Sequence, residues 1–314
     1  MNYKEEYCMP LTPERKQYWE DILEKTAGAR TKMFAERKVP EDYARHMEFV
    51  ETSQATLAVP SVGVPVTCYI TMPKECKRKC LVYINIHGGG WHGPWCEDDA
   101  LYCAQIAHEV GCITVDVDYA LTPQYTFPVP VEQIYEVARW VTERCESWGV
   151  DSEHIVIGGC SSGGNMAAAV SLMAGVRKDV RFCAQILDCA SLDKATDPQY
   201  KPCGYEYMMP PERGRGFTAL YLGEELATPY LPIASPAYAT DHMLRSQPRT
   251  LIISGGKCSF RFENEEYGAR LAAQGVEVTI KRFRNSQHAF NIRMKDEWRE
   301  SHDIVIRYLK SVCL

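Results

Sequence analysis

The pattern of hydrophobic and polar positions changes character at about Lys79. Before this point, β-rich stretches cover 49–59 and 64–72, and the turn-forming sequence Pro-Ser-Val-Gly at 60–63 separates them. Because such turns typically join neighbouring strands, the pattern predicts an antiparallel pair. Nearer the start, Thr12 and Pro13 precede an apolar stripe and predict a helix over 12–27.

After Lys79, short apolar runs alternate with amphipathic stretches. This alternation predicts βαβ units and a mostly parallel sheet with helices on both faces. Together with the antiparallel pair, the apolar runs predict an α/β fold with an eight-stranded sheet. The runs are 81–86, 112–117, 155–157, 182–187, 250–253 and 276–280, and the clearest helical stretches are 101–110, 131–148 and 265–273.

The segment 190–247 differs from its surroundings, because it is long, rich in proline, tyrosine and glycine, and without a clear strand pattern. An insertion at this place is expected above the carboxyl ends of the strands, where ligands bind in such sheets. The chain has no internal repeat or low-complexity tract. We therefore expect one domain over 1–314, with cap elements from about 1–47 and 190–247.

The clearest chemical motif is the sequence Gly-Cys-Ser-Ser-Gly-Gly at 159–164. It follows a strand candidate and precedes a helix of small residues, and a G-x-S-x-G sequence in this context is typical of a nucleophile elbow. The elbow lifts a serine, here Ser161, above the sheet at a helix N-terminus, which favours negative charge. A simple Gly/Ser turn or a phosphate-binding turn is the alternative.

A second motif, His-Gly-Gly-Gly-Trp at 87–91, directly follows another strand candidate. Its glycines let backbone N–H groups converge on one point, as an oxyanion hole requires, together with the N–H of Ser162. His87 and His92 could instead be a metal pair or surface histidines. Because no Asp, Glu or Cys with ligand spacing lies nearby, we expect no metal. A third candidate, His288, follows the last strand candidate and keeps the order Ser…acid…His of this elbow type.

These motifs resemble the hormone-sensitive-lipase-type carboxylesterases of the α/β-hydrolase superfamily. The resemblance covers 79–314 and includes the stretch Asp-Tyr-Ala-Leu-Thr-Pro-Gln at 118–124, which is similar to the family's D-Y-R-L-A-P-E. It implies that Ser161 is the nucleophile and His288 the general base. The oxyanion N–H groups would then come from Gly88, Gly89 and Ser162.

The chain departs from the family pattern in several places. Ala120 and Gln124 replace a charged pair, and Cys160 and Ser162 replace the Asp and Ala of the family's elbow. The most consequential departure is Cys258, which stands where the family places its catalytic aspartate.

A different carboxylate would therefore have to complete the triad. Our first hypothesis is Asp188, because it ends the strand candidate expected beside that of the elbow. Glu263, one helical turn beyond Cys258, is the second candidate. A weakened or absent acid at position 258 is the third.

Composition narrows the function classes. The chain has 314 residues, 46% hydrophobic, with 35 basic against 41 acidic side chains. This balance gives no indication of nucleic-acid or anionic-membrane binding. No apolar run reaches 18 residues, so we expect no membrane span. The 14 cysteines show no C-x-x-C spacing, and the start lacks the apolar core of a signal peptide, so we expect reduced thiols in a cytoplasmic protein.

The sequence as a whole predicts a serine carboxylesterase that hydrolyses short-chain acyl esters, needs no cofactor and binds a small-molecule ester. An arylformamidase or other amidase on the same scaffold is one alternative. The other is a small-molecule-binding pseudoenzyme with a degraded triad. A homodimer is the assembly that we consider for this chain.

Overall fold

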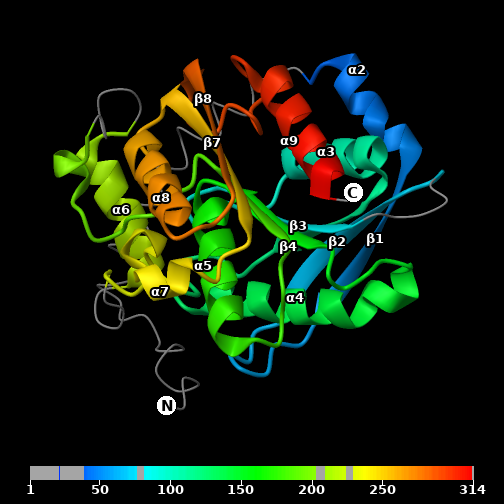
Figure 1. The fold of residues 1–314 in the computed structure, drawn as a ribbon, viewed down its shortest axis with the longest axis horizontal. Helices are drawn as coiled ribbons and strands as arrows, with labels where there is room; N and C mark the ends of the chain where they lie inside the picture. Colours follow the sequence, from blue (N-terminus) through cyan, green and yellow to red (C-terminus); the bar gives the residue numbers. More distant parts are fainter. Residues whose placement is uncertain (1–20, 22–38, 76–80, 203–208, 224–228, 313–314) are drawn as a thin grey trace.

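An eight-stranded sheet runs through the protein in the order β1-β2-β4-β3-β5-β6-β7-β8 (Figure 1). The computed structural model describes residues 21, 39–75, 81–202, 209–223 and 229–312. Strands β1, β2 and β4 pair antiparallel, and the pairs from β4 to β8 are parallel. The strands are β1 Val50–Leu57, β2 Val66–Pro73, β3 Val82–Ile86, β4 Ile113–Asp118, β5 Ile155–Cys160, β6 Ala184–Asp188, β7 Arg249–Lys257 and β8 Val278–Gln287.

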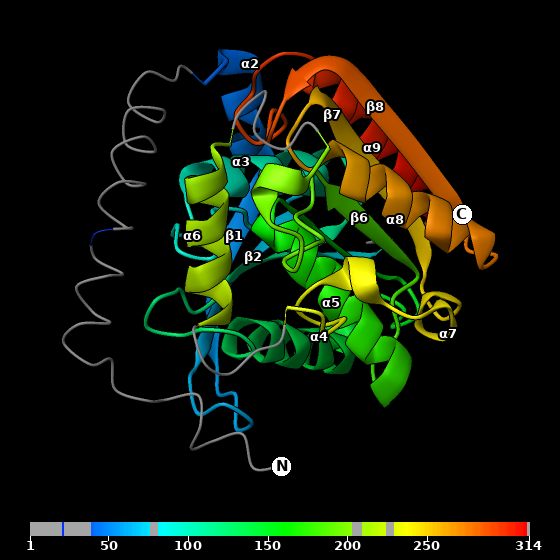
Figure 2. The ribbon, with the colours of Figure 1, turned by 90° about the vertical axis from the view of Figure 1, so that its left-hand side faces the viewer.

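Helices cover both faces of this sheet (Figures 1 and 2). They are α2 Glu41–Ala44, α3 Glu97–Ile106, α4 Val129–Trp148, α5 Ser162–Arg177, α6 Pro211–Leu222, α7 Asp241–Leu244, α8 Arg261–Ala273 and α9 Trp298–Val312. Short 3-10 segments lie at Arg45–Phe49, Pro198–Tyr200 and Pro236–Tyr238, and a π turn at Ala107–Gly111 extends α3.

The alternation of side chains along the central strands builds two cores. On β3, Val82 and Ile84 pack into the core that α4 and α5 cover, whereas Tyr83 packs into the core of α3 and α9. All residues of β3 are buried. A strand covered on both faces is expected to be apolar throughout, which is why its sequence reads as a continuous apolar run.

The structure confirms the α/β fold, the antiparallel pair and the eight-stranded sheet predicted from the sequence. The helix predicted over 12–27 lies outside the described residues apart from residue 21. Within 190–247, the described residues contain the helices α6 and α7, the 3-10 segments Pro198–Tyr200 and Pro236–Tyr238, and no strand. Figure 2 shows α6 standing apart from α8 and α9. The division into a body and a cap stays a prediction.

The topology places several loops at one edge of the sheet. The parallel strands β5, β6 and β7 are neighbours, and their register pairs Cys160 with Asp188 and Asp188 with Ile253. The residues that follow these strands therefore meet at a common edge. Among them are Ser161 after β5 and Cys258 after β7.

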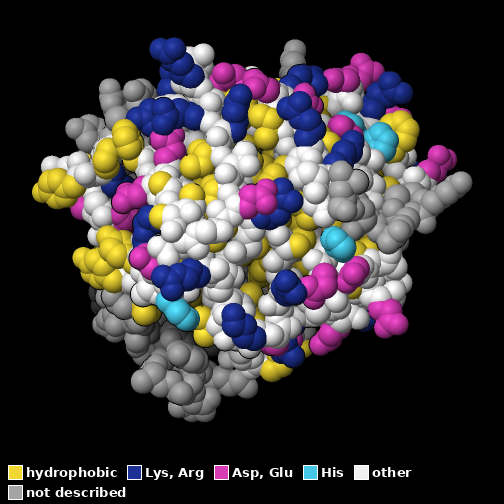
Figure 3. Space-filling view, in the orientation of Figure 1, with side chains coloured by type: hydrophobic (Ala, Val, Ile, Leu, Met, Phe, Trp, Pro, Cys, Tyr) yellow, Lys and Arg dark blue, Asp and Glu magenta, His cyan; other side chains and the backbone are white. Residues whose placement is uncertain are grey.

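Two further observations concern the surface. Among the described residues, none of the helices has both the length and the apolar character that crossing a bilayer requires. On the face drawn in Figure 3, Lys and Arg side chains are interspersed with Asp and Glu rather than gathered in one field.

Candidate active site

Ser161 occupies a sharp turn between β5 and α5. Its backbone is strained, with φ 60° and ψ −114°. The turn is held by its N–H, which donates to the Asp188 carbonyl at 2.9 Å, and by its carbonyl, which accepts from Ser191 N at 3.1 Å. A Cβ at Gly163 would lie 1.9 Å from the backbone oxygen of Ile86, so the close packing of α5 on β3 requires glycine. This is the nucleophile elbow predicted from the sequence motif.

His288 follows β8 and faces the elbow. Its Nε2 lies 2.9 Å from Ser161 Oγ, which is within the range for a general base and the hydroxyl it deprotonates. The side chain is buried, and the Phe260 ring packs edge-on against it at 5.0 Å between centroids. The structure thus brings together the two residues that the sequence predicted as nucleophile and base.

Cys258 supplies the contact on the other side of the imidazole. Its Sγ lies 3.2 Å from His288 Nδ1 and accepts from Phe260 N at 3.4 Å. Burial alone raises the pKa of the Cys258 thiol. The hydrogen bond from Cys189 and the charge and hydrogen bond of His288 outweigh this effect, so the pKa lies well below that of an ordinary cysteine. The sulfur is therefore suited to carry a negative charge beside the imidazole.

Cys189, which follows β6, completes a buried group with Cys258 and His288. Its hydrogen bond to Cys258, together with burial, raises the pKa of the Cys189 thiol well above its ordinary value. The Sγ atoms of both cysteines and a ring nitrogen of His288 all lie within 4.8 Å of one another. Two thiols and an imidazole are ligands that zinc accepts. Because the hydrogen bonds of the site already account for this arrangement, the absence of a metal stays our prediction.

The two carboxylates considered for the third position, Asp188 and Glu263, are both largely buried. Burial raises the pKa of Asp188 to about 6, although hydrogen bonds from Asn291, Cys160 and Cys189 and the charge of His288 oppose the shift. Glu263 accepts from Leu192 N at 2.8 Å and pairs with Lys201 Nζ at 2.7 Å. Both oxygens of Glu263 are thus already bonded to groups other than the histidine.

The glycine loop after β3 lies beside the elbow. Gly88 and Gly89 line the same cavity as Ser161, and Gly90 N donates to Ser162 Oγ at 3.0 Å. A Cβ at Gly90, which has φ 63°, would lie 2.3 Å from the Phe217 ring. The Ser162 hydroxyl therefore bonds the loop to the start of α5. Gly88, Gly89 and Ser162, the residues predicted to supply the oxyanion N–H groups, thus lie beside Ser161.

The histidines of this loop have structural contacts. The His87 ring stacks on Tyr119 at 4.2 Å between centroids, and its Nδ1 lies 2.8 Å from Gly88 O. Tyr119 also donates its hydroxyl to the carbonyl of His87 at 3.0 Å. His92 Nδ1 lies 3.1 Å from Gly90 O. These contacts stabilise the conformation of the glycine loop.

Comparison with protein families agrees with this geometry. A family model described as the alpha/beta hydrolase fold matches residues 83–292, which is more than half of the chain. The chain belongs to the alpha/beta hydrolase family.

Several characterised members are similar to this hydrolase. An arylesterase of Saccharolobus solfataricus is 28% identical over 247 residues, covering 76% of this chain and 77% of the relative. Arylacetamide deacetylase of Oryctolagus cuniculus is 27% identical, covering 72% of each chain. The crystal structure of carboxyl esterase 2 from the fungus Tuber melanosporum superposes with a TM-score of 0.76 at 27% identity, covering 85% of this chain and 88% of that one. These similarities confirm the hormone-sensitive-lipase-type resemblance, and the chain is a carboxylesterase-type serine hydrolase.

The hydrolase has a cavity of about 230 Å³ beside Ser161 and His288. Sequence reasoning missed several side chains of its wall, because the segments that carry them have no recognisable motif. The missed residues are Ser191 and Lys194 after β6, Arg213 and Phe217 of α6, and Ile292 and Arg293 after His288.

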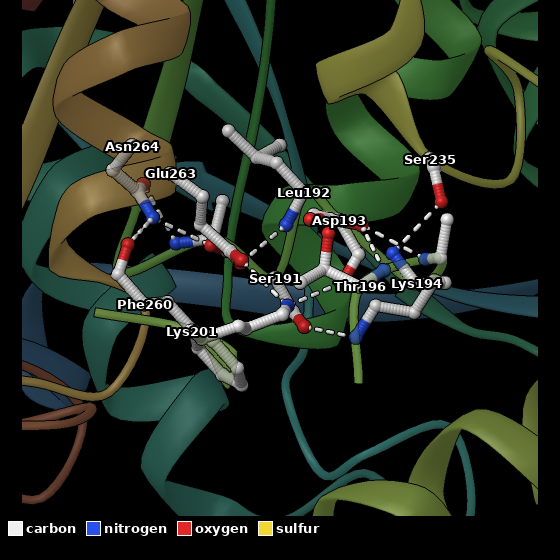
Figure 4. Close-up of polar contacts among 12 residues, drawn as sticks. Ser191, Leu192, Asp193, Lys194, Thr196, Lys201, Ser235, Phe260, Glu263 and Asn264 are labelled. Carbon is white, nitrogen blue, oxygen red and sulfur yellow. Dashed lines mark hydrogen bonds and ion pairs between the residues drawn. The ribbon is translucent and has the colours of Figure 1, made fainter. Parts of the chain in front are cut away.

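Lys194 lines the cavity and belongs to a polar network (Figure 4). Its Nζ donates to Ser191 Oγ, and its backbone N–H donates to Ser235 Oγ at 2.8 Å. Burial and the nearby charge of Lys201 lower the pKa of Lys194 to about 7, although Glu263 and Asp193 oppose the shift. A buried amine with a strongly lowered pKa in the wall of a cavity is a candidate for ligand binding.

Asn264 joins the two loops that follow β6 and β7 in this hydrolase. Its side chain is fully buried, and its Nδ2 donates to Ala190 O at 2.6 Å and to Phe260 O at 2.7 Å. Its Oδ1 accepts from Ala190 N at 3.0 Å (Figure 4). The loops that carry Cys189 and Cys258 are therefore bonded to a common side chain.

Proposed function

We propose that this hydrolase cleaves short-chain carboxylic esters through an acyl-enzyme on Ser161, with Cys258 in the place of the usual carboxylate. The observation that carries the proposal is the continuous chain of contacts from Ser161 Oγ to His288 Nε2 at 2.9 Å, and from His288 Nδ1 to Cys258 Sγ at 3.2 Å. A nucleophile, a base and a group that orients the base are the parts of a catalytic triad.

The proposed reaction has two stages. His288 removes the proton from Ser161, whose oxygen attacks the ester carbonyl. The N–H groups of Gly88, Gly89 and Ser162 stabilise the resulting oxyanion, and His288 then protonates the departing alcohol. In the second stage His288 deprotonates water, which attacks the acyl-enzyme. His288 then returns this proton to the Ser161 oxygen as the bond between that oxygen and the acyl carbon breaks, which releases the acid and restores the enzyme.

The charge state of Cys258 decides which proton position His288 adopts. A Cys258 thiolate accepts a hydrogen bond from Nδ1–H, so Nε2 keeps a lone pair for the proton of Ser161. A neutral thiol would instead donate to Nδ1, and the proton on Nε2 would then face the serine in the unproductive tautomer. The lowered pKa of Cys258 supports the productive arrangement, and the thiolate also stabilises the imidazolium that forms during attack.

We place Cys258, rather than Asp188 or Glu263, in the third position because of these contacts. Glu263 is committed to Lys201 and to the backbone of Leu192. The backbone carbonyl of Asp188 accepts a hydrogen bond from the N–H of Ser161 at 2.9 Å, so we propose that Asp188 positions the nucleophile.

The cavity supports a small substrate. Its volume of about 230 Å³ lies below the range of about 300–1,000 Å³ that drug-sized ligands occupy. Trp91, Phe217 and Phe260 are aromatic parts of its wall. We therefore expect kcat/KM to fall as the acyl chain is lengthened.

Two experiments test the proposed function. Labelling with a fluorophosphonate should be stoichiometric for the wild type and absent from Ser161→Ala. Ser171→Ala, which changes a buried serine on the helix that follows Ser161 and lies outside the cavity wall, should label like the wild type. Hydrolysis of p-nitrophenyl esters of increasing chain length should follow the same pattern. Wild-type turnover no greater than that of Ser161→Ala would favour the pseudoenzyme, and cleavage of anilides or formamides with little ester turnover would favour the amidase.

The assembly and the location stay predictions. We propose a homodimer, because β8 is an edge strand with exposed Ile280 and edge strands offer unpaired backbone groups to a partner. Sedimentation velocity of the wild type beside Ile280→Lys tests it. The cytoplasmic location predicted from the sequence would be tested by fractionation of the source cells.

A further inference from the structure

We propose that Lys194 and Arg213 form a subsite for an anionic group, so that the preferred substrates are esters carrying a carboxylate on their acyl or alcohol part. This proposal rests on the esterase function proposed above and names its substrate class. It is carried by the position of two cationic side chains in the wall of the cavity that contains Ser161 and His288.

Lys194 is buried against aromatic rings. Only 7% of the residue is exposed, and its Nζ lies 4.9 Å from the centre of the Trp91 ring and 5.5 Å from that of Phe260. Its side-chain hydrogen bond goes to the hydroxyl of Ser191. An ammonium has three donors, so this single bond leaves donors that a ligand could take.

Lys194 also lacks the partner that a buried cation normally has. In the part of the chain that the structure describes, no carboxylate forms an ion pair with it, because Glu263 is paired with Lys201 at 2.7 Å. Figure 4 shows the amine of Lys194 directed to Ser191, whereas Glu263 is bonded to Lys201. A buried charge without a counterion is costly, so an anion in the cavity would stabilise it.

Arg213 adds a second cation from α6. Its Nε is buried and has no hydrogen-bond partner among the described residues, and its guanidinium packs over Phe217 at 5.5 Å. The described structure shows no ion pair for Arg213 either. Guanidinium groups bind carboxylates through parallel hydrogen bonds.

The charges of the whole cavity wall permit this assignment. Besides Lys194 and Arg213, the wall contains Arg293 and the carboxylates of Asp98 and Asp99. With all five ionised, the wall carries a net charge of +1. The ester carbonyl would lie at Ser161 and the carboxylate of the same small molecule at the two cations.

Paired substrates provide the test. On the acyl side, mono-p-nitrophenyl succinate is compared with p-nitrophenyl 4-methylpentanoate, in which an isopropyl group replaces the carboxylate. On the alcohol side, 4-acetoxybenzoate is compared with 4-isopropylphenyl acetate. The measured quantity is the ratio of kcat/KM for the anionic ester to that for the neutral ester, and the pair that shows the preference reports which side the subsite serves.

The variants separate charge recognition from structural support. Lys194→Met should lower the ratio about 10- to 100-fold, as expected for loss of a hydrogen bond between charged groups, while Lys194→Arg should retain most of it. Arg213→Met should lower the ratio as well. Arg215→Met is the matched control, because Arg215 lies on the same helix, is paired with Asp197 at 2.8 Å and lies outside the cavity wall; it should leave the ratio unchanged.

Three results would overturn the proposal. The first is a wild-type ratio near one for both pairs. The second is a Lys194→Met variant in which kcat/KM falls equally for the two substrates of a pair. The third is a Lys194→Arg variant whose ratio is as low as that of Lys194→Met. If the wild type hydrolyses none of the four esters, the proposed function fails separately. Calorimetry of succinate and 4-hydroxybenzoate binding to the wild type and Lys194→Met still decides whether the anion subsite exists.

Discussion

Replacing Cys258 tests the catalytic assignment most directly. Cys258→Ala removes the Sγ that lies 3.2 Å from His288 Nδ1 and leaves the elbow and the glycine loop untouched. A hydrogen bond to a charged group contributes about 1.5–3 kcal/mol. If this energy is realised in the transition state, where the imidazolium forms, kcat should fall about 10- to 150-fold.

Two further substitutions refine the prediction. Cys258→Ser should fall nearly as far as Cys258→Ala, because a serine hydroxyl stays neutral and cannot supply the negative charge. Cys258→Asp places a carboxylate at the same position and should match or exceed the wild type. A complete loss of the carboxylate in a Ser-His-Asp triad costs about 10⁴ in kcat, which sets the upper limit for the alanine variant.

The assay is steady-state hydrolysis of p-nitrophenyl acetate across pH, with fluorophosphonate labelling to count competent sites. In the wild type, kcat/KM should decline at low pH as Cys258 becomes protonated, and in Cys258→Asp the pH profile should follow a carboxylate instead. A Cys258→Ala variant within threefold of the wild type, combined with collapse of Asp188→Asn, would refute the reasoning and return the acid role to Asp188.

Three other changes test separate features of the structure. Ser162→Ala, which restores the residue usual in the family, removes the acceptor of Gly90 N–H and should lower kcat about 2- to 10-fold in p-nitrophenyl acetate hydrolysis, with little change in KM. Gly163→Ala should destabilise the protein by about 3 kcal/mol or more in urea unfolding, because its Cβ would lie 1.9 Å from Ile86 O. Burial lowers the pKa of His302 to about 3, so between about pH 3 and 6.5 the unfolded chain binds a proton that the folded chain does not. The free energy of unfolding should therefore rise with pH through this window. Between pH 7 and pH 5 the wild type should lose about 2 kcal/mol of stability more than His302→Gln loses.

Two of these predictions have a control variant, and each has an outcome that would contradict it. Gly63→Ala also changes a glycine with positive φ, but its Cβ would meet no atom within 4 Å, so it should cost only about 1 kcal/mol. For His302, the control is His154→Gln, because this histidine is 37% exposed. Parallel pH curves for the wild type and His302→Gln would contradict the assignment of the titrating group. A Ser162→Ala variant with unchanged kcat would show that the glycine loop needs no bond from that hydroxyl.

Much of the fold follows from the sequence because buried parallel strands leave a strong signal. The run at 81–86 differs from β3 by one residue, and 112–117 is shifted from β4 by one. The strand at 276–280 was less well bounded. β8 extends to Gln287 through exposed polar residues, since an edge strand is solvated on one side and its sequence does not read as apolar. β7 likewise continues to Lys257 through a register shift against β8.

The site was predictable where chemistry and backbone geometry require particular residues. Ser161 and His288 were identified because the elbow and the chain order restrict both residues. The partner of His288 Nδ1 could not be settled in the same way, because a carboxylate is expected there and only the geometry shows the sulfur of Cys258 in contact. No sequence motif marks Lys194, because only the folded structure shows that its side chain lines the cavity.

The bonds of Asn264 have a consequence for how this site tolerates change over time. Asn264 bonds the loop that carries Cys258 through Phe260 O, and it bonds the neighbouring loop through both backbone groups of Ala190. The position of Cys258 therefore does not depend only on its contact with His288. If the position of this loop depended on an ion pair with the histidine, replacing the acid would allow the loop to move. Here the bonds of Asn264 hold the backbone at position 258 independently of its side chain, so different side chains can occupy that position without moving the loop.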